Sequence, residues 1–123
     1  SERDWEDIRF GKKIVKQTSA LDIGQSIVVR RGTVLAVEAF EGTDECIRRG
    51  GKLGNGKDVT LVKVSKPAQD MRFDVPVIGP KTIESCQEAG VGTIAVEAGK
   101  TLFLGLDEIK SKCCEGKITI VGF

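Results

Sequence analysis

Apolar and β-branched positions fall into short runs that alternate with helical patterns along the chain. Two of these runs, 26–30 and 33–37, are joined by Arg31 and Gly32, and a two-residue connection with glycine favours a tight β-hairpin. A nearly continuous apolar run over 58–65 is typical of a central strand that is covered on both faces. The pattern therefore predicts strands alternating with helices.

Helical spacing and helix-boundary residues mark the segments between the strands. Pro80 predicts the first turn of one helix and Gly90 its C-cap. Thr43 or Asp44 is expected to cap the N-terminus of another. The predicted helices cover 5–21, 43–53, the segment from Pro80 to Gly90, and 106–115 with Gly116 as its cap.

Two further strand runs, 93–97 and 101–104, flank a Gly99-Lys100 turn and predict a second hairpin, and 117–121 predicts a terminal strand. Short loops between mixed elements favour one mixed β-sheet flanked by helices. We therefore predict a single domain of the α/β class.

The tetrapeptide Ala-Val-Glu-Ala occurs twice, at 36–39 and at 95–98. Each copy stands at the end of a predicted strand. A match of this length is a weak sign of internal repetition, and no low-complexity segment accompanies it.

Composition restricts the class of protein. With 123 residues and 13.3 kDa the chain suits one domain, and 40% hydrophobic and 30% charged residues are typical of a globular protein. The net charge of +1 and the lack of interleaved basic and aromatic residues do not favour nucleic-acid binding. No signal-peptide pattern is present, and no apolar run approaches the roughly 18 residues of a membrane span. Because the chain opens with Ser1 and has Met71 as its only methionine, we interpret it as a piece of a longer protein.

The absence of histidine removes the commonest general base and every imidazole metal site. The four cysteines contain no Cys-x-x-Cys spacing, so we interpret them as reduced thiols. Carboxylates or lysines must then carry any catalysis.

Asp70 and Asp74 are four residues apart, and this spacing places both on one side of an extended segment or of a helical turn. Hard carboxylate oxygens of this kind suit Mg²⁺ or Mn²⁺. Pairing with Arg72 and Lys66 on a solvated loop is the structural alternative. Met71 and Phe73, between the two aspartates, could contact an apolar ligand.

Two other clusters could bind phosphate. Thr43 and Asp44 follow a predicted strand, and ligands of α/β proteins bind at the carboxyl ends of strands. Lys81 and Thr82 stand at a predicted helix N-terminus, where the helix dipole favours an anion. A purely structural role as helix starts is the alternative for both pairs.

Lys63 lies inside the apolar 58–65 run, and a lysine there needs a partner or a route to water. Exposure at a sheet edge, a substrate phosphate and pairing with Asp70 are each compatible with this position.

Five blocks along the chain together resemble one known family, the C-terminal domain of the LpxI-type UDP-2,3-diacylglucosamine pyrophosphatases of lipid A synthesis. The blocks occur in the family's order and span nearly the whole chain: residues 21–25, 34–44, 66–76, 78–82 and 92–99.

The resemblance implies a metal-dependent hydrolase that splits UDP-2,3-diacylglucosamine into UMP and 2,3-diacylglucosamine 1-phosphate at the cytoplasmic face of the bacterial inner membrane. It implies that residues 1–123 are the C-terminal catalytic and lipid-binding domain of a two-domain protein, and that the piece without its N-terminal domain turns over little. Asp70 and Asp74 would be the catalytic and metal-binding carboxylates, with Mg²⁺ or Mn²⁺ as cofactor. Thr43, Asp44, Lys66, Lys81 and Thr82 would hold substrate phosphates, and Met71 and Phe73 would contact acyl chains.

Two other functions stay open at this stage. The domain could be a lipid- and phosphate-binding and homodimerisation module whose chemistry is done by the N-terminal domain. It could also be a stand-alone nucleotide or phosphate sensor.

Overall fold

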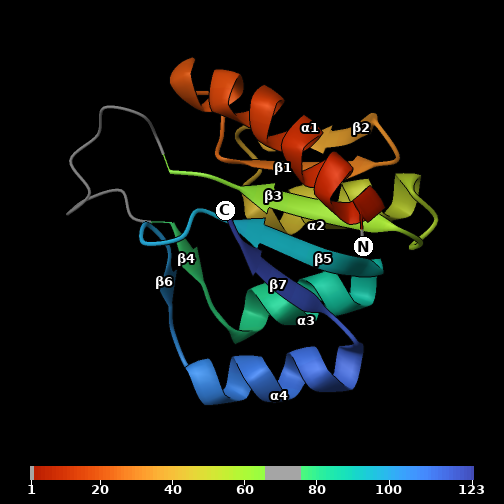
Figure 1. Ribbon diagram of the computed structural model, residues 1–123, viewed down its shortest axis with the longest axis vertical. Helices are drawn as coiled ribbons and strands as arrows, with labels where there is room; N and C mark the ends of the chain where they lie inside the picture. The colour runs from red at the N-terminus through yellow and green to blue at the C-terminus, as the bar shows by residue number, and fades with distance from the viewer. Residues whose placement is uncertain (1, 66–75) are drawn as a thin grey trace.

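The computed structural model describes residues 2–65 and 76–123. Four helices and seven strands occur within these ranges (Figure 1). In chain order they are α1 (Glu2–Ala20), β1 (Ser26–Arg30), β2 (Thr33–Val37), α2 (Thr43–Leu53), β3 (Val59–Lys63), β4 (Val77–Ile78), α3 (Pro80–Ala89), β5 (Val91–Val96), β6 (Leu102–Phe103), α4 (Leu106–Gly116) and β7 (Thr119–Gly122).

The main sheet has five strands in the order β2-β1-β3-β5-β7, so the predicted central strand is indeed central. β1 is antiparallel to β2 and to β3, whereas β3, β5 and β7 are parallel to one another. This mixed sheet between helices confirms the predicted α/β class. Strands β4 and β6 form a separate parallel pair.

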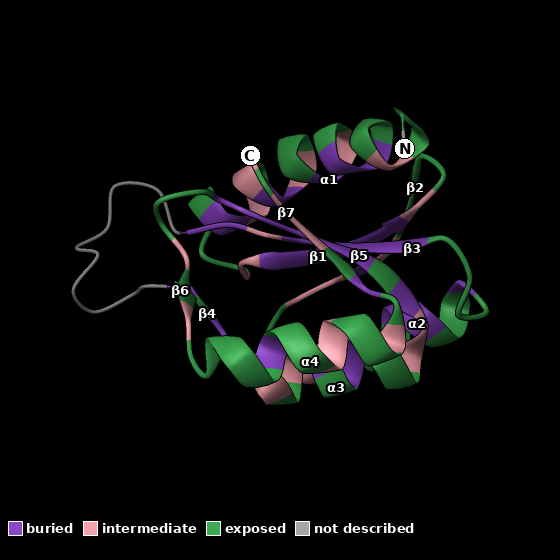
Figure 2. Cartoon of the chain, turned by 60° about the horizontal axis from the view of Figure 1, so that its bottom comes forward, coloured by how far each residue is buried: buried purple, intermediate pink, exposed green. Residues whose placement is uncertain are grey.

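Helices cover both faces of the sheet, α1 on one and α2, α3 and α4 on the other (Figure 2). Because side chains alternate along a strand, β3 contributes Leu61 to the core under α2 and α3, and Val62 to the core under α1. Both side chains are fully buried. The near-continuous apolar character of this segment therefore results from its two covered faces.

The first predicted hairpin is confirmed. Arg31 and Gly32 form its turn with φ of 47° and 75°, the left-handed conformation that a two-residue hairpin turn requires. The buried Asp7 of α1 accepts both turn amides, each at 2.9 Å from a carboxylate oxygen. The same carboxylate thus fixes the hairpin to the helix above it.

Two glycines inside α2 allow close packing. A Cβ at Gly50 would lie 2.5 Å from Val28 Cγ1, and one at Gly51 would lie 2.4 Å from the Ala89 carbonyl oxygen. One glycine therefore permits contact with β1 and the other with α3, which holds α2 and α3 side by side.

The second predicted hairpin is wrong. β5 pairs with β3 on one side and β7 on the other, so neither of its edges is free for 101–104. β6 pairs instead with β4, and Leu102 N–H donates to the Pro76 carbonyl at 2.9 Å.

The helix boundaries follow the prediction with two corrections. Pro80 begins α3, and Gly90 ends it in the left-handed conformation with φ of 80°. The N-cap of α2, however, is Gly42, with no side-chain cap, so neither Thr43 nor Asp44 has the capping role. Gly116 belongs to α4, and Lys117 is its C-cap.

Candidate functional site

Polar residues gather where β2, β3 and β5 end. These strands run in the same direction, because β1 is antiparallel to β2 and β3 and because β5 is parallel to β3. Their carboxyl ends therefore share one end of the sheet, which we call the carboxyl end. Glu38 follows β2, Lys63 closes β3, and Glu97 follows β5. Ser26 joins them because it opens the antiparallel β1, directly opposite Lys63.

On the face covered by α2, four of these groups form what we call the Lys63 cluster: Ser26, Glu38, Thr43 and Lys63. Lys63 Nζ donates to Thr43 Oγ1 at 3.0 Å, and the same hydroxyl donates to Glu38 Oε1 at 3.2 Å. Ser26 Oγ lies 3.5 Å from the Thr43 oxygen. The Thr43 hydroxyl thus connects an ammonium to a carboxylate from three different elements.

Lys63 stands on the central strand, so exposure at a sheet edge does not explain it. Burial lowers the pKa of Lys63, and the carboxylates of Glu38 and Asp44 oppose that shift. Among the residues that the structure describes, its Nζ makes one hydrogen bond, to Thr43, and no ion pair within 4.0 Å. Within 2–65 and 76–123 the half-buried ammonium therefore has donors that no side chain or backbone group accepts.

Asp44 links the N-termini of α2 and α3. Ser85 Oγ on α3 donates to Asp44 Oδ1 at 3.1 Å, and Lys81 Nζ lies 3.9 Å from Asp44 Oδ2. Neither helix has a side-chain cap, and a Cβ at Gly42 or Gly79 would meet nothing within 4 Å. Two positive helix ends and a lysine therefore converge beside the Lys63 cluster.

On the opposite face, a second group, the Glu97 cluster, consists of Lys16, Ser19, Ser65 and Glu97. Glu97 Oε1 accepts the backbone N–H and the hydroxyl of Ser65 at 2.6 and 2.9 Å, and Oε2 accepts Lys16 Nζ at 2.8 Å. Ser19 Oγ donates to the Ser65 carbonyl at 3.4 Å. Burial alone would raise the pKa of Glu97, but the hydrogen bonds from Lys16 and Ser65 outweigh it and hold the pKa below its usual range.

The structure brings together part of the residue set predicted from sequence. Thr43, Asp44 and Lys81 lie at the adjacent N-termini of α2 and α3, and the half-buried Thr82 follows in the first turn of α3. The remaining predicted residues lie outside the described residues: Lys66, Asp70, Met71, Phe73 and Asp74.

Sequence reasoning assigned no role to Glu38, Ser26, Ser85 or Glu97. The repeated Ala-Val-Glu-Ala was the available signal for the two glutamates, because it placed each at the end of a strand. For the serines no local signal exists, since their contacts depend on strand pairing and helix packing.

No group of three or more cysteine, aspartate or glutamate side chains within 2–65 and 76–123 has a metal-binding arrangement. All four cysteines are free, and burial raises the pKa of Cys46 and of Cys86 to about 12, which keeps both thiols protonated at neutral pH.

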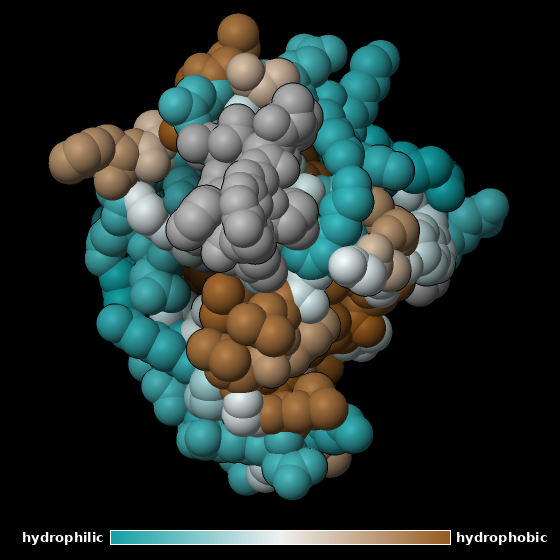
Figure 3. All heavy atoms as spheres, turned by 90° about the vertical axis from the view of Figure 1, so that its left-hand side faces the viewer, coloured by the Kyte–Doolittle hydropathy of each residue, from teal (hydrophilic) through white to brown (hydrophobic). Residues whose placement is uncertain are grey.

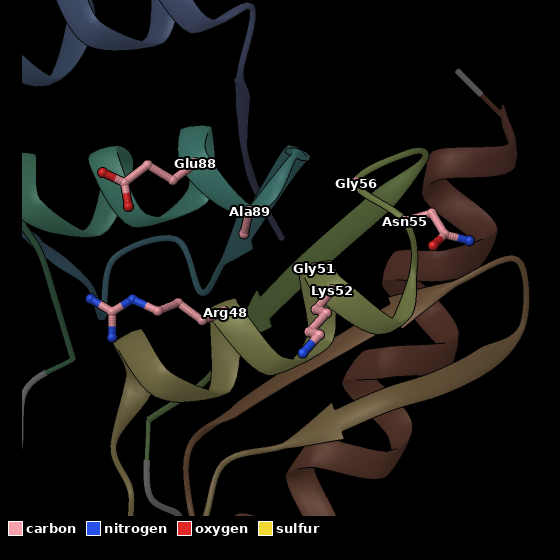
Figure 4. Close-up of a pocket in the computed structure, with 7 residues that line it drawn as sticks. All are labelled: Arg48, Gly51, Lys52, Asn55, Gly56, Glu88 and Ala89. Carbon is pink, nitrogen blue, oxygen red and sulfur yellow. The ribbon is translucent and has the colours of Figure 1, made fainter.

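A cavity of about 430 Å³ lies away from these clusters, between the C-terminal parts of α2 and α3 (Figure 4). Arg48, Lys52 and Asn55 line it from one side and Glu88 from the other. Their polar ends point in different directions and do not converge on one centre (Figure 4). This arrangement does not define a ligand.

An apolar surface adjoins the point where the chain re-enters the described structure at residue 76. A patch of brown atoms, bordered by teal ones, lies in the lower middle of Figure 3. Val77, Leu102, Leu104 and Leu106 are its exposed large side chains. A neighbouring groove of about 310 Å³ is lined by Phe103, Leu106, Ile109, Lys110, Cys113 and Ile120.

The site is thus a polar, charge-lined end of an α/β sheet next to an apolar surface. The chain belongs to the LpxI C-terminal domain family, which matches residues 1–121. A relative from Caulobacter vibrioides, UDP-2,3-diacylglucosamine pyrophosphatase LpxI, is 38% identical over 110 residues. The match covers 84% of this chain and 39% of that relative, so the chain spans about two fifths of the relative's length.

No helix in the described ranges has the length and the apolar character that crossing a membrane requires.

Proposed function

We propose that this chain is the C-terminal domain of a hydrolase that cleaves the diphosphate of UDP-2,3-diacylglucosamine into UMP and 2,3-diacylglucosamine 1-phosphate. The observation that carries the proposal is the convergence of charged groups at the carboxyl end of the sheet, beside Ser65, the residue that precedes 66–75. Ser65 and Pro76, which flank that segment, both lie in the described structure. The family and the relative's name supply the substrate class.

Phosphate binding is assigned to the N-terminal turns of α2 and α3. Lys81 and the Thr82 hydroxyl offer donors to phosphoryl oxygens, and Thr43 contributes at the first turn of α2, where backbone N–H groups of a helix have no intrahelical partner. The two helix dipoles favour the same negative charge. Asp44 holds Lys81 and Ser85 in place between the helices. Lys66, which follows the anchored Ser65, is assigned to the same phosphates.

Metal binding and catalysis are assigned to Asp70 and Asp74, whose carboxylates suit a hard cation. Bound Mg²⁺ or Mn²⁺ would supply positive charge against the diphosphate and lower the pKa of a coordinated water. The described residues contribute by shaping the surroundings of that segment: the Glu97 cluster fixes the backbone of Ser65 at its start.

Acyl-chain binding is assigned to Met71 and Phe73 together with the exposed apolar surface around β4 and β6. Val77 and Leu102, neighbours in the β4–β6 pair, are part of that surface. Contact with the inner face of the bacterial inner membrane, in the cytoplasm, would bring the lipid substrate to this side. The longer protein would add an N-terminal domain, and a homodimer is compatible with the same surface.

Replacement of Asp70 tests the assignment. In the full-length protein that contains this chain, Asp70→Ala should lower the hydrolysis of UDP-2,3-diacylglucosamine about 100-fold or more. The unfolding free energy should change by less than about 0.5 kcal/mol. Product formation would be followed as UMP released at saturating Mg²⁺.

The matched control is Asp107→Asn, which alters an exposed aspartate in the first turn of α4. It should keep wild-type turnover. Unchanged turnover in Asp70→Ala would reject the catalytic assignment.

A binding module without catalysis is the second candidate, and the apolar surface favours it. In that case Asp70→Ala leaves hydrolysis intact. Polar replacements at Met71 and Phe73 then weaken binding of 2,3-diacylglucosamine 1-phosphate and leave metal binding unchanged.

A further inference from the structure

Lys63, the cation of the Lys63 cluster, has no role in the substrate binding or catalysis proposed so far. Its ammonium sits at the end of the central strand, sheltered by α2, and its one hydrogen bond in the described structure goes to a neutral hydroxyl. Glu38 accepts a hydrogen bond from the same Thr43 hydroxyl at 3.2 Å, and its carboxylate makes no direct hydrogen bond with the Lys63 ammonium. A lysine with a purely structural task would be expected to gain a direct ion pair, because burying an unpaired charge is costly.

The geometry also fixes where the ammonium lies. Lys63 faces Ser26 across the β1–β3 pair, and both side chains lie on the sheet face that α2 covers. Thr43 Oγ1 accepts a hydrogen bond from Lys63 Nζ at 3.0 Å and donates one to Glu38 Oε1 at 3.2 Å. The lysine is thus held by one of its donors, and no other residue that the structure describes takes up the remaining donors, which suit an anion.

We propose that Lys63 binds a phosphoryl oxygen of the substrate diphosphate, and that Thr43 and Glu38 position its ammonium for this contact. The inference rests on the proposed function and adds a residue to it. Lys63 is the binding residue, whereas Glu38 acts through the Thr43 hydroxyl and is a positioning residue.

Titration of this 123-residue chain with inorganic pyrophosphate, without divalent metal, tests the binding role. The absence of metal separates the Lys63 contact from anything held by Asp70. Lys63→Met should raise the dissociation constant about 10-fold to 100-fold, the range for losing a charged hydrogen bond. Lys112→Met is the matched control, because Lys112 is also partly buried but is paired with Glu84 at 2.9 Å. It should bind like the wild type.

Equal affinities of Lys63→Met and wild type, or no pyrophosphate binding by the wild type, would overturn the inference. Should Lys63→Met fail to fold, Thr43→Val supplies the test, because valine keeps the shape and removes the connecting hydroxyl. It should weaken binding about 10-fold. If Thr43→Val binds pyrophosphate as tightly as the wild type, the inference is likewise overturned.

The positioning role has its own readout. In the part of the chain that the structure describes, the charged and titratable groups that act on Lys63 are Glu38 after β2, Asp44 and Cys46 on α2, and Cys86 on α3. Glu38 raises the pKa of Lys63, so Glu38→Gln should move the loss of pyrophosphate binding at high pH to a lower pH than in the wild type. If the pH dependence of pyrophosphate binding is the same in Glu38→Gln and the wild type, Glu38 does not position Lys63 and has only a structural role.

Failure of this inference is distinguishable from failure of the proposed function. If Asp70→Ala abolishes hydrolysis while Lys63→Met binds pyrophosphate normally, only the Lys63 assignment is lost. If Lys63→Met loses pyrophosphate while Asp70→Ala still hydrolyses the substrate, the catalytic proposal fails and the anion site stands.

Discussion

Glu38 and Glu97 occupy the same place in identical tetrapeptides at the same end of one sheet, yet they face opposite helical layers. In the first copy Ala36 belongs to the core under α2 and α3, and in the second copy Ala95 belongs to the core under α1. Because side chains alternate between the two faces of a sheet along a strand, each glutamate side chain lies on the same face as the alanine two residues before it. Strand register, and not local sequence, therefore decides what each glutamate contacts.

The two glutamates also differ in how completely they are satisfied. Glu97 is 7% exposed and accepts three hydrogen bonds from Lys16 and Ser65. Glu38 is half-buried and accepts one side-chain hydrogen bond, from Thr43, among the contacts of the described residues. The comparison separates a carboxylate that anchors the backbone of Ser65 from a carboxylate beside Lys63, whose ammonium makes one hydrogen bond among the described residues.

Truncating both glutamates should give the largest difference between them. Glu97→Ala leaves the Ser65 amide and hydroxyl unpaired in a buried place and should lower the unfolding free energy by about 3 kcal/mol. Glu38→Ala removes one partly exposed hydrogen bond and should cost about 1 kcal/mol. Urea unfolding of this chain would measure both.

Glu88→Ala is the control for this pair, because Glu88 is exposed on α3. It should change the unfolding free energy by less than about 0.5 kcal/mol. Similar decreases of the unfolding free energy in Glu38→Ala and Glu97→Ala would contradict the distinction between Glu97, which anchors the backbone of Ser65, and Glu38, which positions Lys63.

Local signals in the sequence predicted the local parts of the fold. Gly32 favours the left-handed backbone of a two-residue turn, and Pro80 and Gly90 bound a helix by their own backbone preferences. The 101–104 run has equally good strand composition, but both edges of β5 are already occupied, one by β3, about 40 residues earlier in the chain, and the other by β7. Competition between distant strands is invisible to local patterns.

The candidate site also contains residues that local sequence signals predicted and residues that they did not. Thr43, Asp44 and Lys81 were predicted because each follows a strand or starts a helix, and the structure places them side by side. Glu38 and Ser26 were not, because their contacts arise only after β2, β1 and β3 pair in the observed register. The glycines of α2 are a further case: their close packing against β1 and α3 has no local signature.

The ionisation of Glu97 provides the next, smaller test. Its pKa in the folded chain is below the unfolded value of about 4.3, so the carboxylate stabilises the fold above that pH and the contribution is lost as pH falls through the folded pKa. Glu97→Gln keeps the shape and removes the charge. It should cost about 1 kcal/mol at neutral pH, and the difference from wild type should shrink below about pH 4.

Urea unfolding at a series of pH values would follow that difference. All other titrating groups are common to both chains and cancel. A difference that persists undiminished into the acid range would contradict the role of the Glu97 charge.

The smallest expected effect separates the two lysines beside Glu97. Lys16 Nζ lies 2.8 Å from Glu97 Oε2, and Lys100 Nζ lies 3.9 Å from the same oxygen with more of its side chain exposed. Lys16→Met should therefore cost about 1 kcal/mol and Lys100→Met less than about 0.3 kcal/mol. Double-mutant cycles with Glu97→Gln would isolate each pair, since the coupling energy removes effects that either side chain has alone. Equal coupling for the two lysines would mean that Glu97 is held by the general charge of its surroundings and not by its contact with α1.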